Sequence, residues 1–346
     1  MRRLCKLVLP LPVLFFEGCA TLQSTSNTHG PAARSIAHLS HAMTIVFLIT
    51  TLVMWVLVVV ALKKRRGSLQ EHMPIDIGGG QAWVVIGGLI VPLLVLSVFF
   101  FVGLELLSDF PIHGMHEGMN MNPGASVPKP DILIVGHQWW WEVHYLTGDS
   151  DQQFTTANEI HIPAHRAVNI ELESADVMHS FWVPSLHGKV DLVPGHPNFI
   201  RIEASEPGDF IGQCAEYCGV QHANMHILVV AQEPAAFDEW LANQRKPGVQ
   251  PTSPQALMGQ QAFLAGPCAK CHVIRGTLAG GRVAPDLTHI GSRKYIAANS
   301  FPNNNAYLEA WITNAQSLKP GAKMPDITQY NGVQLRALVA YLRQLQ

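Results

Sequence analysis

Two long apolar runs without a charged residue constrain the fold of this chain more than any other feature. Residues 42–62 form a run of 21 positions, and residues 82–104 form one of 23. Each run is long enough to cross a hydrocarbon core about 30 Å thick as a helix. Because cationic loops stay in the cytoplasm, the cluster Lys63-Lys64-Arg65-Arg66 between the runs indicates that both flanking regions face outward. We therefore predict a two-helix transmembrane anchor over residues 36–107.

The first 19 residues have the order of an export signal that ends in a lipoprotein cleavage site. Basic residues precede an apolar stretch at residues 7–16, and Gly18-Cys19 follows. This order predicts an exported lipoprotein whose mature chain begins at a lipidated Cys19. An uncleaved apolar leader with an incidental cysteine is the alternative, since Glu17 is unusual at such a site.

Beyond the anchor, residues 128–232 have the short alternating patterns of β-strands. Val168, Ile170 and Leu172 alternate with polar residues, as do Ile200 and Ile202. Strands with one apolar face predict a β-sandwich or barrel.

The rest of the chain has a different texture. Residues 233–254 are predicted to be a linker, flexible at its Pro- and Gln-containing end, residues 246–254. Helical patterns at residues 256–264, 306–315 and 332–345 then predict a small all-α domain over residues 255–346.

One loop of twelve residues gathers two thiols, an imidazole and a thioether. It reads Cys214-Ala-Glu-Tyr-Cys218-Gly-Val-Gln-His222-Ala-Asn-Met225, and His179 offers a second imidazole. A blue copper ion needs two histidines, one cysteine and a weak methionine, and a second cysteine lets both sulfurs bridge two copper ions. We therefore predict a dinuclear copper centre for electron transfer, with these five side chains as ligands and a backbone carbonyl as a further weak ligand. A zinc site and a Cys214–Cys218 disulfide are the alternatives, but zinc sites seldom use methionine.

A second motif, Cys268-Ala-Lys-Cys271-His272, predicts a covalently bound haem. In C-x-x-C-H the two thiols add to the haem vinyl groups and the histidine ligates the iron. Met324, followed by Pro325, is the natural sixth ligand, and a thioether there raises the reduction potential. A metal-binding or redox C-x-x-C and a core methionine are the alternatives.

The twelve-residue loop resembles the one in subunit II of the haem-copper cytochrome c oxidases. The resemblance extends to Gly136-His137-Gln138-Trp139-Trp140-Trp141 and to Asp176-Val177-Met178-His179-Ser180. It implies a cupredoxin-like β-barrel whose dinuclear centre is called CuA. It also implies that Glu216 lends its carbonyl to copper and its carboxylate to a magnesium ion shared with subunit I. Trp139 would be the exposed aromatic residue that accepts electrons, with Trp140 as the alternative.

The last domain resembles class I cytochromes c, in which a proline carbonyl, here that of Pro285, orients the proximal imidazole of His272. The whole fold would be multidomain: two transmembrane helices, a cupredoxin-like β-barrel and an all-α cytochrome c domain. This fusion is the arrangement of one bacterial oxidase type. It implies a place in the cytoplasmic membrane, with both redox domains on the periplasmic side. Oxidase subunits I and III and a cytochrome c or other small redox donor would be the partners, and no nucleic acid is expected.

The resemblance implies that electrons pass from the donor to haem c, then to CuA, then to the haem-copper centre of subunit I, where oxygen is reduced to water. Oxygen reduction itself needs a histidine cluster on membrane helices, which the two apolar runs do not carry. A CuA subunit of a nitric oxide reductase is the alternative within redox chemistry. A membrane-bound copper-delivery protein is the alternative from another class.

Charge is divided unequally between the two outer domains. Residues 129–232 contain four Lys and Arg against thirteen Asp and Glu, whereas residues 255–346 contain nine against three. Partners of opposite sign associate faster and in better register than neutral ones. We therefore expect the two domains to attract each other.

Overall fold

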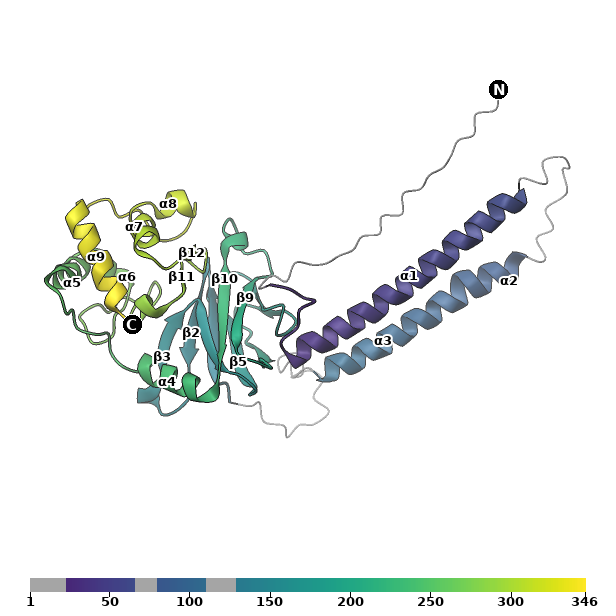
Figure 1. The fold of residues 1–346 in the computed structure, drawn as a ribbon, viewed down its shortest axis with the longest axis horizontal. Helices are drawn as coiled ribbons and strands as arrows, with labels where there is room; N and C mark the ends of the chain where they lie inside the picture. The colour runs from purple at the N-terminus through teal and green to yellow at the C-terminus, as the bar shows by residue number, and fades with distance from the viewer. Residues whose placement is uncertain (1–22, 66–79, 110–128) are drawn as a thin grey trace, which may run out of the picture.

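The structure is a computed structural model that describes residues 23–65, 80–109 and 129–346. The predicted signal with Cys19 lies outside these residues. Two long helical rods project from a head made of two parts, a β-sandwich and a group of helices (Figure 1). The first rod is α1 (Pro31–Arg65), and the second consists of α2 (Gly80–Val85), the π-helical turn η1 (Ile86–Ile90) and α3 (Val91–Asp109).

Both rods are apolar enough and long enough to cross a membrane, over Pro31–Lys63 and Gly80–Leu107. In the most apolar part of each, none of the residues is buried by the rest of the protein. Large apolar side chains such as Phe47, Leu52 and Phe101 are exposed on them. Side chains of this kind are stable at a surface only where lipid or another protein covers them. The two predicted spans are therefore consistent with a membrane anchor.

The first helix begins earlier than the apolar run at residue 42 because its first turns pack on the head. The backbone N–H groups of His29 and Gly30 both donate to the Ser185 carbonyl, at 2.7 and 3.0 Å. A Cβ atom on Gly30 would lie 2.2 Å from the Leu186 carbonyl oxygen, so only glycine fits there. Ala33, in the first turn of α1, is 3% exposed. These contacts attach the N-terminal end of α1 to the β-sandwich.

Two five-stranded sheets form the β-sandwich domain. One has the strand order β3-β2-β1-β5-β8 and the other β4-β10-β9-β6-β7, with β1 and β5 parallel and β4 and β10 parallel. The strands are β1 (Ile132–His137), β2 (Trp140–Tyr145), β3 (Phe154–Ala157), β4 (Glu159–Pro163), β5 (Val168–Ser174), β6 (His179–Trp182), β7 (Val190–Leu192), β8 (Asn198–Ile202), β9 (Gly208–Cys214) and β10 (His226–Gln232). Short 3₁₀ turns η2 (Ser150–Gln152) and η3 (His222–Asn224) connect some of them.

The core lies between the two sheets, as the alternation predicts. Val168, Ile170 and Leu172 on β5 and Ile200 and Ile202 on β8 are all buried, whereas the polar residues between them are not. Trp141, Phe181 and Leu186 are also fully buried there. Of the two architectures that the sequence predicts, a β-sandwich or a barrel, the structure thus shows a β-sandwich.

The segment predicted as a linker contains a helix. This helix, α4 (Pro234–Gln244), directly follows β10 and buries Phe237 and Leu241 against the β-sandwich. Trp240, on the same helix, stacks on His161 with ring centroids 4.0 Å apart. The following residues are also attached, since His289 bonds to the Lys246 carbonyl and the Gly248 N–H donates to the Arg275 carbonyl.

The remaining elements form the helical domain. They are α5 (Pro254–Ala265), α6 (Cys268–Cys271), η4 (Ile290–Ser292), β11 (Tyr295–Ile296), β12 (Phe301–Pro302), α7 (Asn305–Thr313), α8 (Ala315–Leu318) and α9 (Gly332–Gln344). The three predicted helices are confirmed as α5, α7 and α9. Helices α5 and α9 approach closely at Gly259, where a Cβ atom would lie 2.0 Å from the Ala337 carbonyl oxygen.

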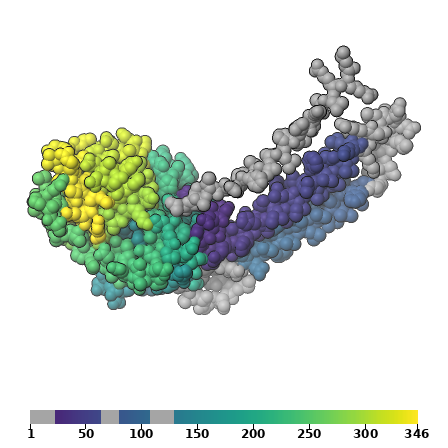
Figure 2. Space-filling view, viewed as in Figure 1, coloured from purple at the N-terminus to yellow at the C-terminus, as the bar shows by residue number. Residues whose placement is uncertain are grey.

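The helical domain rests directly on the β-sandwich domain (Figure 2). Two exposed ion pairs cross the boundary, Lys294 with Asp209 and Lys323 with Asp176. In both, the cation belongs to the helical domain and the anion to the β-sandwich domain, as the charge division predicts. Hydrogen bonds between buried groups also cross it: Arg293 Nη2 donates to Thr156 Oγ1 at 3.1 Å.

Candidate functional site

The residues of the predicted copper centre meet at one end of the second sheet. Strand β9 ends at Cys214 and β10 begins at His226, so the twelve-residue loop closes the end of this hairpin. Strand β6 pairs with β9, with Phe181 opposite Cys214, and this register brings His179 to the loop. The four ligands close in sequence therefore meet a fifth from a distant strand.

The distances join all five predicted side chains into one cluster. The two sulfurs of Cys214 and Cys218 are 3.7 Å apart. Cys214 Sγ lies 3.9 Å from His179 Nδ1, and Cys218 Sγ lies 3.7 Å from His222 Nδ1 and 3.8 Å from Met225 Sδ. Each histidine is thus beside a different sulfur. Two sulfurs side by side, with one imidazole beside each, form a donor set that would suit a dinuclear copper centre.

The cysteines and His179 of the cluster are buried, and the His179 imidazole is held in one orientation. His179 is 0% exposed and both cysteines are 3% exposed. Nε2 of His179 donates to Asp176 Oδ1 at 2.9 Å, which leaves Nδ1 as the metal-binding nitrogen on the side of Cys214. Asp176 is in turn fixed by the backbone N–H of Gln138. Its role was not predicted, although its place three residues before His179 in the sequence was a signal.

The backbone carbonyl of Glu216 lies beside the cluster, with its oxygen 3.2 Å from Cys214 Sγ. The two thiols behave as a pair. The hydrogen bond from Cys218 lowers the pKa of the Cys214 thiol, and the same contact raises the pKa of Cys218. One thiolate is therefore available near neutral pH, and removal of the second proton requires a cation such as a metal ion.

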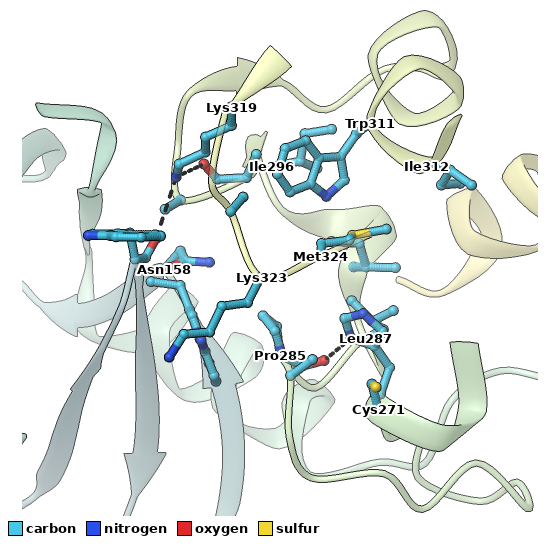
Figure 3. A pocket seen from close by; sticks show the side chains of 18 of the residues that line it. Asn158, Cys271, Pro285, Leu287, Ile296, Trp311, Ile312, Lys319, Lys323 and Met324 are labelled. Atoms are coloured by element: carbon cyan, nitrogen blue, oxygen red, sulfur yellow. Dashed lines mark hydrogen bonds between the residues drawn. The ribbon is translucent and has the colours of Figure 1, made fainter. Parts of the chain in front are cut away.

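The residues of the predicted haem site border a cavity of about 240 Å³ (Figure 3). Cys271, His272 and Met324 line it together with apolar side chains, among them Leu287, Ile296 and Ile312. Cys268 begins the one-turn helix α6, which Cys271 ends, so both thiols are carried by one rigid turn. Because the cavity has an apolar wall, one thiol of the pair carried by α6, and an imidazole and a thioether of the kind that ligate iron, it fits a haem.

The imidazole of His272 is prepared for iron. Its Nδ1 donates to the Pro285 carbonyl at 2.7 Å, as predicted, and this bond leaves the Nε2 lone pair free for a metal. Burial lowers the pKa of His272, so the ring is neutral at neutral pH. Arg293, which also lines the cavity, is 8% exposed, and its Nε has no hydrogen-bond partner among the described residues. A cation in this position suits the anionic propionate groups of a haem.

Trp139 lies between the two sites rather than on an open surface. Its indole Nε1 donates to the Cys218 carbonyl at 3.0 Å, and its ring also lines the haem cavity. Gly219, with φ of 118°, allows this approach, since a Cβ atom there would lie 2.9 Å from the ring. Trp140 lines the same cavity and stacks on His137, whereas Trp141 is in the core.

Comparison with known proteins agrees with this geometry. Residues 146–232 match the family described as cytochrome c oxidase subunit II, periplasmic domain, and residues 256–346 match cytochrome c. Cytochrome c oxidase subunit 2 of Alkalihalophilus pseudofirmus is 34% identical over 98% of this chain and 96% of its own length. The chain belongs to the cytochrome c oxidase subunit II family. The Bacillus subtilis member is 28% identical over 98% of this chain and 97% of its own.

Among solved structures, the periplasmic domain of subunit II of cytochrome oxidase of Bradyrhizobium japonicum is 30% identical, with a TM-score of 0.32. It covers 35% of this chain and 97% of its own. Membership of the subunit II family makes this chain part of a haem-copper oxidase complex, with subunit I and a redox donor as partners. It also implies CuA copper in the β-sandwich domain and haem in the helical domain.

Proposed function

We propose that this subunit II receives electrons for a bacterial respiratory oxidase at its own covalent haem c and delivers them through its CuA centre. The copper ligands would be His179, Cys214, Cys218, His222 and Met225, with the carbonyl of Glu216. The haem would be attached to Cys268 and Cys271 and ligated by His272 and Met324. When bound, the haem and the copper pair supply one-electron transfer from the donor to subunit I, where oxygen is reduced to water.

The shared wall between the two sites carries this proposal. The cavity beside His272 and Met324 is also lined by Gln138 and Trp139 of the β-sandwich domain. Trp139 continues from that wall to the Cys218 carbonyl. A single tryptophan thus contacts both sites, and the chain itself provides a short connection between them. Trp139 would serve as a bridge within the chain, since it is only partly exposed.

Further assignments follow from the family and the topology. The N-terminal end of α1 is attached to the β-sandwich, which supports placing this end and both redox domains on the same, periplasmic side of the cytoplasmic membrane. The Glu216 carboxylate would hold a magnesium ion shared with subunit I, subunit III would be a further partner, and Cys19 would carry lipid.

The other functions are less well supported. A copper-delivery protein has no use for a haem cavity whose wall includes Trp139, the residue that bonds to the copper loop. A CuA subunit of a nitric oxide reductase is not favoured, because the full-length relatives are subunits of cytochrome c oxidase.

The test is the copper and haem content of the purified chain. We expect two copper ions and one haem per chain, and we expect the haem to stay attached when the chain is denatured. His222→Ala is expected to lose copper and keep haem, whereas His196→Ala, which removes an exposed histidine, is expected to keep both. Copper loss in both variants, or one copper ion in the unaltered chain, would contradict the proposed ligand set.

A further inference from the structure

The segment Lys319–Met324, which ends at the proposed haem ligand, lies against the copper loop. Lys319 follows α8 and reaches across the domain boundary (Figure 3). Its Nζ donates to the Asn224 carbonyl at 2.8 Å and the Trp139 carbonyl at 3.4 Å, both in the β-sandwich domain. A third bond, of 2.9 Å, goes to the Ala297 carbonyl in its own domain.

The Lys319 side chain is a buried cation. The residue is 3% exposed, and among the described residues no carboxylate pairs with its ammonium. Three carbonyl oxygens, which match the three N–H donors of an ammonium, replace the lost water. Burial lowers the pKa of Lys319 to about 8, and the electrostatic interaction with Cys218 opposes this shift. The side chain therefore carries its charge at neutral pH.

The charge is placed beside the copper loop. Asn224 directly precedes Met225, and the Trp139 indole donates to the Cys218 carbonyl. The neighbouring Pro320 carbonyl accepts a 2.6 Å bond from Gln221, which is 5% exposed in the same loop. The segment Lys319–Met324 thus holds the copper loop at Gln221 and Asn224, which lie on either side of the proposed ligand His222.

We propose that Lys319 is a positioning residue of the copper centre. Its ammonium holds the segment that carries Met324 on the copper loop and makes the copper pair easier to reduce. The proposal rests on the ligands assigned under the proposed function. In the transfer concerned, the haem iron loses one electron and the copper pair gains it, and no bond or proton moves. A fixed cation in a poorly solvated region favours the added negative charge, because little water screens it.

The test compares three substitutions in the full chain, within its oxidase complex. Lys319→Gln keeps an N–H donor without the charge, Lys319→Met removes both, and Lys319→Arg keeps the charge. Arg336→Met, on the exposed face of α9, removes one charge of the same sign from the same domain. Spectroscopic redox titration gives the copper and haem potentials separately.

Both neutral variants are expected to lower the copper potential, so that the equilibrium constant for transfer from haem to copper falls about tenfold, or about 59 mV for one electron. Lys319→Arg and Arg336→Met are expected to stay within about threefold of the unaltered chain. A neutral variant that keeps copper at its original potential would overturn the proposal, and so would an arginine variant that behaves like the neutral ones. Absence of copper from the unaltered chain would instead refute the proposed function.

Discussion

Gln221 offers a direct test of how firmly the two domains are docked. Its side-chain Nε2 donates to the Pro320 carbonyl across the boundary, at 2.6 Å, and its Oε1 accepts from Asn224 at 2.8 Å. Gln221→Leu keeps a side chain of similar size but leaves the Pro320 carbonyl without this donor. Because Pro320 is exposed and water can reach its carbonyl, the loss is that of an ordinary hydrogen bond, about 0.5 to 1.5 kcal/mol. Of the two bonds of Gln221 only the one to Pro320 crosses the boundary, so docking should weaken by about that amount, or roughly 2- to 13-fold.

Hydrogen exchange at the boundary measures this loss. The backbone N–H of His226 donates to the Ala298 carbonyl and that of Lys294 to Glu159 Oε2, so both amides are protected only while the domains are docked. We expect both to exchange roughly 2- to 13-fold faster in Gln221→Leu, with unchanged exchange in the core of each domain. Gln255→Leu, the same change at an exposed position of α5, is the control. Unaltered protection of both amides in Gln221→Leu would refute the reasoning.

Four other predictions concern the sites and the boundary. Cys218→Ser should abolish the paramagnetic signal of two equivalent copper nuclei and keep the haem, because one sulfur cannot bridge both ions; survival of that signal would refute the bridging role. Met324→Ala should keep the haem, which the two thiols of α6 hold, but lower its potential; an unchanged potential would place the sixth ligand elsewhere. Burial alone would raise the pKa of Glu142, but hydrogen bonds with His137 and His144 lower it to about 2 from its ordinary 4.5. Its stabilising contribution is therefore complete above about pH 4.5 and is lost as the pH falls toward 2, and thermal melting should show a smaller acid-induced loss in Glu142→Gln. Finally, transfer from haem to copper should slow moderately as ionic strength rises, because salt screens the two exposed interdomain ion pairs but not the buried hydrogen bonds; flash-induced haem oxidation that is flat with salt would make the charge division incidental.

The redox residues were predictable because their motifs are local. Four of the five copper side chains lie within one twelve-residue loop, and the two haem thiols lie within one helical turn. Such spacings limit the possible geometry before any tertiary structure forms. The position of His179 is different, since it depends on the pairing of β6 with β9, which the twelve-residue loop does not specify.

Helix α4 shows where pattern reading was incomplete. Phe237 and Leu241 have the i, i+4 spacing of an apolar helix face, but the segment also contains charged residues and precedes a Pro- and Gly-containing stretch. Because its apolar face consists only of Phe237, Leu241 and the partly buried Trp240, this short helix depends on the sheet beneath it. Its stability therefore comes from packing that the local sequence does not describe.

The sequence predicts that the two domains attract each other, but it does not predict which residues meet at their boundary. Overall composition indicated attraction, whereas the contacts depend on particular backbone carbonyls, such as those of Trp139 and Asn224. Every residue has a carbonyl group, so a sequence cannot show which of them will accept from Lys319. The position of His161, which is buried between Glu159 and Trp240, is likewise not marked by any local motif of the sequence.

The docked boundary makes the two outer domains poor candidates for separate expression. A β-sandwich domain cut off after α4 would present Glu159 and Thr156 without Lys294 and Arg293, which meet them in the whole chain. The helical domain alone would present the Lys319 ammonium to water and open the haem cavity on the side that Trp139 closes. Reduction potentials and stabilities measured on the separate domains would be those of molecules that expose surfaces which the intact subunit buries. Engineered exchange of the haem domain between relatives would need to carry the boundary residues of both partners with it.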